Sequence, residues 1–146
     1  MAHTINWIQK PHLIYVRLEG DIFAYEVETI AEALYEQIQE VEDAEGSVHL
    51  IIEVAGAIIA DKLINYSRLK FKTNSNVDWA IVVGQLRLAG MVLAIFSNLV
   101  PVNLKQITTV EEAVTFIHER DIHVSSRADV AQIVEKIAAL KSEQDG

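Results

Sequence analysis

The stretch VHLIIEV at Val48–Val54 decides the fold of this chain. It is an almost continuous apolar run, and the polar loop of residues 42–47 precedes it. Such a run is typical of a strand that is covered on both faces. We therefore predict the central strand of a sheet here, with helices packed on both sides.

A second buried strand is predicted at Val77–Val83, sequence VDWAIVV. Between the two strands, Ala55–Ala60 is expected to be a connection and Lys62–Lys72 a helix. The last strand is expected at Val102–Ile107, after the apolar helix Leu86–Leu99. That helix is too short and too polar in places to cross a bilayer, which needs about 20 apolar residues.

The chain opens with two short strands, Thr4–Gln9 and Leu13–Glu19, and the turn between them predicts a hairpin. From Phe23 to Val41 the apolar residues recur every three or four positions with glutamates between them. This spacing predicts an amphipathic helix with an acidic, solvated face.

Two helix starts follow the last predicted strand. Thr109–Glu112 has the Thr-x-x-Glu spacing of a capping box, so a helix to about Glu119 should follow. Ser126–Asp129 precedes an apolar stripe at helical spacing, Val130–Leu140, and the tail 142–146 is expected to be disordered.

These elements predict an α/β fold with a single mixed sheet of four to five strands, covered by helices, and an additional C-terminal helix. We expect residues 1–121 to form the α/β domain and residues 122–146 to form a helical extension.

The order of the elements, with an acidic first helix, resembles the STAS family of anti-sigma-factor antagonists and its SpoIIAA-like relatives. The clearest similarity is LIIEVAGAIIAD at Leu50–Asp61, where a strand, an acidic residue, a glycine and a second acidic residue precede the second helix. Val77–Val83 and Thr108–Ile117 are similar to the following strand and the last helix. The resemblance spans Thr4 to Asp121 and implies a STAS-like fold with a regulatory binding role.

One position departs from this family. Its regulatory members have a Ser or Thr after the second acidic residue, and a partner kinase phosphorylates it. Here Asp61 is followed by KLI at residues 62–64. The role of a partner-switching anti-sigma-factor antagonist is therefore kept as an alternative only.

The composition excludes several classes of function. The chain has 146 residues and a formal net charge of −9, which disfavours binding to the phosphate backbone of nucleic acids. It has no cysteine, so disulfides, thiolate metal sites and a cysteine nucleophile are excluded. The segment Met1–Trp7 does not resemble a secretory signal, and we expect a cytoplasmic protein.

Positive charge is concentrated in the expected helix Lys62–Lys72, which has no acidic residue. We predict that a protein partner or a small apolar or anionic ligand binds between this helix, the following helix Leu86–Leu99 and the sheet. The expected contacts are Lys62, Tyr66, Arg68, Lys70 and Phe71, with Glu53 and Asp61 at the rim.

Glu53 and Asp61 would also meet at the carboxyl edge of the sheet, where α/β folds bind ligands. Two such carboxylates can divide acid and base roles. No nucleophile, metal motif or phosphate-binding glycine loop accompanies them in the sequence. We therefore expect a helix cap and a surface carboxylate, and keep an enzyme as the rival interpretation.

The histidines do not have the spacing of metal ligands. His118, Asp121 and His123 could be read as a metal site, but their place at a helix end favours contacts with the last carbonyl groups. His49 is expected to be a hydrogen-bonded sheet histidine and not a general base. We expect neither a metal nor a cofactor.

The predicted function is that of a non-enzymatic binding or regulatory domain that recognises a protein partner or a small ligand. The alternatives are the anti-sigma-factor antagonist, an enzyme that uses Glu53 or Asp61 as acid or base, and a structural homo-oligomer. The apolar stripe Val130–Leu140 suggests a homodimer through the C-terminal helix.

Overall fold

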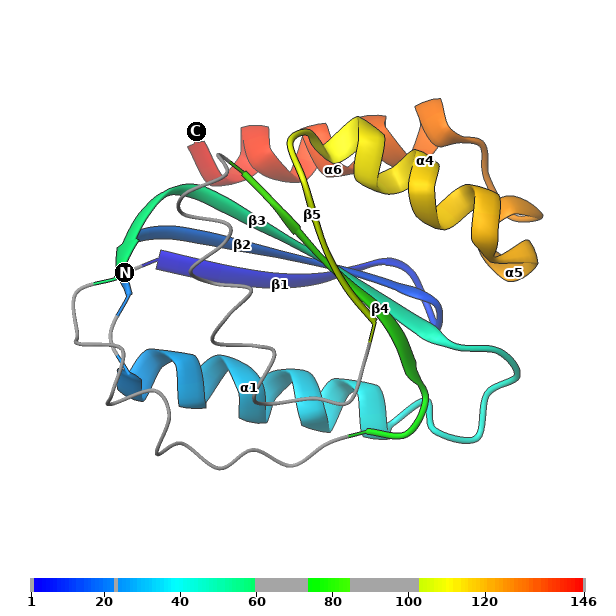
Figure 1. Cartoon of the computed structure of the whole chain (residues 1–146), viewed down its shortest axis with the longest axis horizontal. Coiled ribbons are helices and arrows are strands. Elements are labelled where there is room, and N and C mark those ends of the chain that lie inside the picture. The colour runs from blue at the N-terminus through cyan, green and yellow to red at the C-terminus, as the bar shows by residue number, and fades with distance from the viewer. Residues whose placement is uncertain (1, 23, 60–73, 85–102, 146) are drawn as a thin grey trace.

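The computed structural model describes residues 2–22, 24–59, 74–84 and 103–145. These residues contain a five-stranded sheet whose strands follow one another in chain order (Figure 1). The strands are β1 (Ala2–Gln9), β2 (Leu13–Ile22), β3 (Val48–Ile59), β4 (Val77–Val83) and β5 (Asn103–Ile107). β1 and β2 are antiparallel, and all other neighbours are parallel. The predicted α/β fold with a mixed sheet and an opening hairpin is confirmed.

The two most apolar strands lie side by side at the centre of the sheet. Ile51 of β3 faces Ile81 of β4 in the parallel register, and both side chains are fully buried. Successive side chains of a strand point to opposite faces. Ile51 therefore belongs to one apolar cluster, while Leu50 and Ile52 belong to the cluster on the other face. The VHLIIEV stretch is covered on both sides, as predicted.

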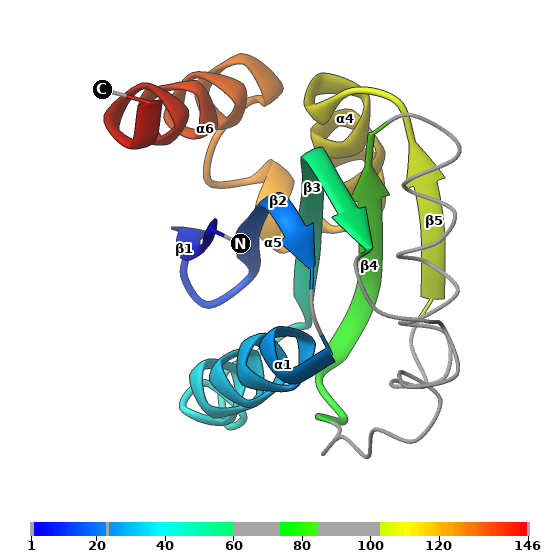
Figure 2. The same ribbon diagram turned by 90° about the vertical axis from the view of Figure 1, so that its left-hand side faces the viewer.

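One face of the sheet is covered by α1 (Ala24–Gln39), and the other by α4 (Val110–Arg120) and α6 (Val130–Asp145) (Figures 1 and 2). The short helix α5 (Ile122–Ser125) connects the last two. α1 is amphipathic, as predicted, and its buried stripe consists of Val27, Ile30, Leu34 and Ile38. None of the helices described is both long and apolar enough to span a bilayer.

The C-terminal helix packs against the sheet of its own chain. Ile133 and Ile137 of α6 are buried in the same apolar cluster as Tyr15 and Ile51. The apolar stripe that suggested a homodimer therefore packs against the sheet of the same chain. A homodimer stays a prediction, and this stripe no longer supports it.

Several predicted boundaries were wrong. β1 begins at Ala2 and not at Thr4, and β2 continues past Glu19 to Ile22. β3 continues to Ile59, so that Ala55–Ile59 is strand and not a connection, because its last residues pair with Asp21 and Ile22 of β2. α6 continues to Asp145, so that residues 142–145 are helical and not a disordered tail. The expected helices Lys62–Lys72 and Leu86–Leu99 lie outside the described residues.

Side chains cap the helices on the second face. The Thr109 hydroxyl accepts a hydrogen bond from the backbone N–H of Glu112 at 3.2 Å, as the capping-box spacing predicts. At the start of α6, Asp129 and Gln132 each accept a hydrogen bond from the other's backbone N–H, at 2.8 Å and 3.1 Å. The helix therefore begins at Val130, directly after the predicted start signal Ser126–Asp129, and Asp129 is the residue of that signal that caps it.

Candidate functional site

Among the predicted binding residues, the structure describes Glu53. The others lie outside the described residues: Asp61, Lys62, Tyr66, Arg68, Lys70 and Phe71. Whether they form one surface stays a prediction.

Glu53 joins the sheet to α6. Its carboxylate accepts a hydrogen bond from the phenol of Tyr15 on the neighbouring strand, and the ammonium of Lys141 pairs with it at 2.7 Å. Tyr15 is fully buried, and burial together with the Glu53 hydrogen bond raises the pKa of its phenol. The phenol therefore stays protonated and donates. Both oxygens of Glu53 are engaged within the chain, so that Glu53 is an internal link between the sheet and α6, and its predicted place at the rim of a ligand site stays a prediction.

A second polar cluster lies at the amino-terminal ends of β2 and β3. Nε2 of His49 is 2.5 Å from Oδ2 of Asp121, and the His49 side chain is only 1% exposed. Asp121 also accepts the backbone N–H of His123 at 2.8 Å. Burial disfavours the ionised carboxyl, but these hydrogen bonds outweigh it and hold the pKa of Asp121 below its usual value. This cluster ties β3 to the start of α5.

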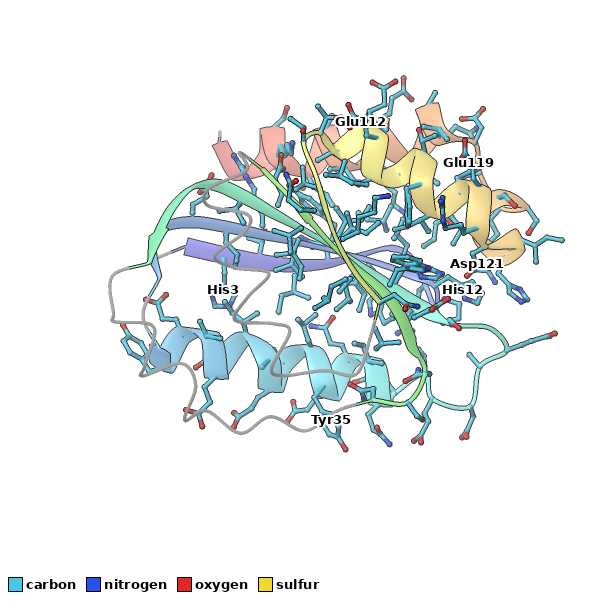
Figure 3. All side chains as sticks on the ribbon, viewed as in Figure 1. His3, His12, Tyr35, Glu112, Glu119 and Asp121 are labelled. Carbon is cyan, nitrogen blue, oxygen red and sulfur yellow. The ribbon has the colours of Figure 1, made fainter. Side chains whose placement is uncertain are left out.

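The ring of His12 completes this cluster (Figure 3). It stacks on His123 with 5.0 Å between the ring centroids, and its Nδ1 lies 3.1 Å from the carbonyl oxygen of Ser47. Gly46 lies so close that a Cβ atom there would be 2.8 Å from the His123 ring and 2.9 Å from the His12 ring. A side chain at position 46 would therefore displace one of the rings.

The residues read as a possible metal site have separate partners. His123 stacks on His12, Asp121 holds His49, and Nε2 of His118 lies 3.2 Å from the carbonyl oxygen of Ala128. Within the described ranges, no group of three or more His, Asp or Glu side chains has a geometry that could hold a metal ion.

The prediction that His49 is a hydrogen-bonded sheet histidine was half right. Nε2 is bonded, but Nδ1 is buried without a hydrogen-bond partner among the described residues.

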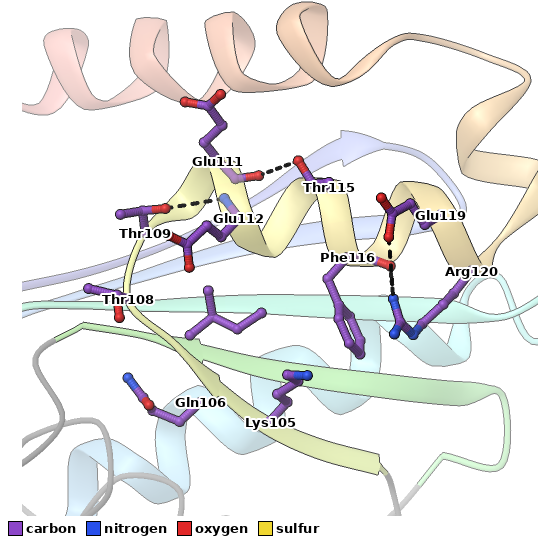
Figure 4. A pocket seen from close by; sticks show the side chains of 11 residues that line it. Lys105, Gln106, Thr108, Thr109, Glu111, Glu112, Thr115, Phe116, Glu119 and Arg120 are labelled. Atoms are coloured by element: carbon purple, nitrogen blue, oxygen red, sulfur yellow. Dashed lines mark hydrogen bonds and ion pairs between the residues drawn. The ribbon is translucent and has the colours of Figure 1, made fainter.

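A groove of about 810 Å³ runs between β5 and α4 (Figure 4). Its lining is polar and charged apart from Ile107 and Phe116: Lys105, Gln106, Thr108, Thr109, Glu111, Glu112, Thr115, Glu119 and Arg120. Its volume lies within the range of about 300–1,000 Å³ that is usual for ligand sites. We call it the β5–α4 groove.

Two cations meet over one aromatic ring in this groove. Nζ of Lys105 lies 4.3 Å, and Cζ of Arg120 3.4 Å, from the centroid of the Phe116 ring. The rings of Trp79 and Phe116 pack edge to face, with 4.7 Å between their centroids. Arg120 donates to the carbonyl oxygen of Phe116 at 3.0 Å, and its nearest acidic neighbour, Glu119, is 3.9 Å away. These contacts hold two positive charges in fixed places beside the groove.

No protein-family model, curated protein or solved structure matches this chain. The resemblance to STAS domains therefore rests on the order of elements and on the Leu50–Asp61 stretch, and it stays a prediction.

The charges of the groove are separated along α4. Glu112, Phe116 and Arg120 are spaced four residues apart, which places them along one side of the helix. The acidic end lies in the first turn and the basic end in the last turn, where the helix dipole favours each sign. The groove thus has Glu112 at one end, and at the other end it has the cations Arg120 and Lys105 together with Glu119, which lies 3.9 Å from Arg120.

Proposed function

We propose that this domain is a non-enzymatic binding domain that holds a short segment of a protein partner in the β5–α4 groove. One observation carries the proposal: Lys105 of β5 and Arg120 of α4 place two cations over the Phe116 ring at the same end of the groove. Two positive charges against the same ring favour an anionic side chain beside them. The first contact of the partner is therefore an acidic residue.

The length of the groove sets a second requirement on the partner. Glu112 and Arg120 are eight residues apart, which corresponds to about 12 Å along a helix. An extended segment covers this distance with about four residues, at ~3.3 Å per residue. A matching partner segment has an acidic residue at the Lys105–Arg120 end and a basic residue about four positions away, at Glu112.

The rival interpretation as an enzyme receives no support from Glu53. A general acid or base must reach the substrate with a proton to give or take, whereas both oxygens of Glu53 are bound by Tyr15 and Lys141. Asp61 lies outside the described residues. The anti-sigma-factor antagonist, the homodimer and the cytoplasmic location stay predictions beside this proposal.

Site-specific photo-crosslinking in the native host tests the proposal. A photoreactive phenylalanine at Thr115, which lines the groove, is compared with one at the exposed Glu135 of α6, which does not line it. We expect a discrete protein adduct from position 115 and none of the same mass from position 135. Mass spectrometry of the adduct then identifies the partner and the crosslinked peptide.

Charge reversal provides the matched control. The double change Lys105→Glu, Arg120→Glu should abolish the adduct, and Lys136→Glu, which changes a cation outside the groove, should leave it intact. A crosslinked peptide without an acidic residue, or an adduct that survives the double change, would refute the proposal.

A further inference from the structure

A second hollow, of about 420 Å³, lies between the end of β1 and the start of α6. We call it the hairpin hollow. It is lined by Ile8, Gln9, Lys10, Arg127, Ala128, Gln132, Ile133 and Lys136. β1 and β5 are at opposite ends of the strand order, so that this hollow is separate from the β5–α4 groove.

The charges of the hairpin hollow have one sign. Its lining includes Lys10, Arg127 and Lys136 and no acidic residue, although acidic residues outnumber basic ones by 21 to 12 in the whole chain. The β5–α4 groove, by contrast, has three glutamates in its lining. The chain repels anions overall, so this hollow is a local exception.

Contacts with the backbone hold two of the cations in place. A terminal nitrogen of Arg127 donates to the carbonyl oxygen of Lys10 at 2.6 Å, and Nζ of Lys136 donates to the carbonyl oxygen of Ile8 at 2.6 Å. A guanidinium has five N–H donors and an ammonium has three. Each of these bonds uses one donor, so that donors remain for a ligand.

Gln9 adds an unused polar group to the same lining. Its Oε1 is buried and has no hydrogen-bond partner among the described residues. A half-turn of the amide exchanges the positions of oxygen and nitrogen with almost no change in shape. In that orientation the amide N–H group takes the buried position of the oxygen. A buried polar atom without a partner is costly, and an oxygen of a ligand in the hollow would satisfy this N–H group.

We propose that the hairpin hollow binds the phosphate monoester group of a small molecule. A phosphate monoester has about two negative charges near pH 7 and three acceptor oxygens, which suit three cations and an amide donor. The volume of the hollow is at the low end of the usual range of about 300–1,000 Å³, which favours a small ligand. The binding site is independent of the partner-binding groove.

Tryptophan fluorescence can test this site in the full chain. The chain has two tryptophans, and Nζ of Lys10 lies 5.9 Å from the centroid of the Trp7 ring. In a Trp79→Phe background, Trp7 alone reports binding. The probes are inorganic phosphate and methyl phosphate, titrated at constant ionic strength, with sodium chloride as the control. We expect a saturable change with both phosphates and none with chloride.

Two substitutions locate the binding. Lys136→Gln removes a cation from the lining, and Gln132→Glu adds a negative charge to it. Gln132→Glu preserves the cap of α6, because a carboxylate oxygen can accept the Asp129 N–H bond that Gln132 Oε1 accepts now. Each change should weaken phosphate binding by about tenfold or more, because each changes the charge in contact with the ligand by one unit.

The control variant is Lys105→Gln, which removes one positive charge at the other edge of the sheet. It should leave the phosphate affinity within about twofold of the parent, because salt screens charges beyond about 10 Å. An unsaturable response, or an equal loss in Lys105→Gln and Gln132→Glu, would overturn the proposal. Saturable binding of a phosphoserine peptide without binding of methyl phosphate would overturn it as well, since the ligand would then be a protein. Neither result bears on the crosslink at Thr115.

Discussion

The imidazole of His49 and the carboxylate of Asp121 meet at 2.5 Å although 72 residues separate them in the chain. His49 lies in the central strand, and Asp121 lies at the junction of α4 and α5. The pair therefore joins the sheet to the helices that carry the β5–α4 groove and the hairpin hollow. Both proposed sites therefore depend on this contact between the sheet and the helices.

Acid should weaken this junction. The pKa of Asp121 in the folded protein lies below its ordinary value of 3.8. A lowered pKa means that the folded state binds this proton less tightly than the unfolded state. The stabilisation is therefore present above the unfolded pKa and is lost as the pH falls through the folded pKa. Denaturant unfolding between pH 7 and pH 2 should show this loss in the wild-type chain.

Asp121→Asn should lower the free energy of unfolding by about 1–3 kcal/mol at pH 7, because the charged hydrogen bonds are lost. The difference from wild type should shrink as Asp121 itself becomes protonated. The control is Glu119→Gln, an exposed carboxylate of α4, which should change stability by less than about 0.5 kcal/mol. A constant difference across the acid range would contradict the assigned role of Asp121.

Alkali should weaken the link between Tyr15 and Glu53. Burial raises the pKa of Tyr15 above its ordinary value of 10.0. With a raised folded pKa, the stabilisation is complete below the unfolded pKa and is lost as the pH rises above it. Tyr15→Phe should cost about 1–3 kcal/mol at pH 7, since Glu53 loses a buried donor. The variant should also lose part of the alkaline decline, whereas Tyr25→Phe, a change at an exposed residue, should keep it.

Gly46→Ala should destabilise the protein and disturb the histidine stack. Gly46 has φ of +93°, which an alanine adopts only with strain, and its new Cβ would be 2.8 Å from the His123 ring. Gly20→Ala, also at positive φ, measures the backbone part of the effect, about 1–2 kcal/mol. Gly46→Ala should cost more, and His123→Ala in the same chain should recover the excess. Additive losses in this double-mutant cycle would show that the close approach has no energetic consequence.

Truncation of Ile137 tests the role of α6 in the core. Ile137 is 1% exposed and packs in the cluster beneath α6. Ile137→Ala should lower the free energy of unfolding by about 2–5 kcal/mol, because it leaves a cavity in a packed core. Ala138→Ser at the neighbouring exposed position should stay within about 0.5 kcal/mol. A small loss of unfolding free energy in Ile137→Ala would indicate that other contacts hold α6 against the sheet.

The sequence could predict the elements whose apolar residues form a pattern within one short stretch of the chain. Val77–Val83 coincides with β4, because its apolar residues Ala80–Val83 are buried in a strand that is covered on both faces. The extension of β3 to Ile59 could not be predicted in this way. AGAII at residues 55–59 contains small residues and a glycine, which weaken a strand pattern, and the pairing with β2 outweighs that preference.

The described candidate sites were missed because their residues meet only in the folded chain. Phe116 and Arg120 are four residues apart, so that their contact could be inferred from a helical pattern, but Lys105 joins them from a strand. Glu53 was singled out from the sequence, whereas its partner Lys141 lies 88 residues away. No spacing rule connects positions so distant.

The two sides of the sheet become complete at different times as the chain leaves the ribosome. The side under α1 has its helix early, since α1 precedes β3, whereas the side over Tyr15 and Ile51 waits for Ile133 and Ile137. Until α6 has left the ribosome, the side of the sheet over Tyr15 and Ile51 exposes apolar surface. Chaperones and proteases act on chains with such exposed surface. Translation that stalls before Val130 should therefore yield a product that the cell removes.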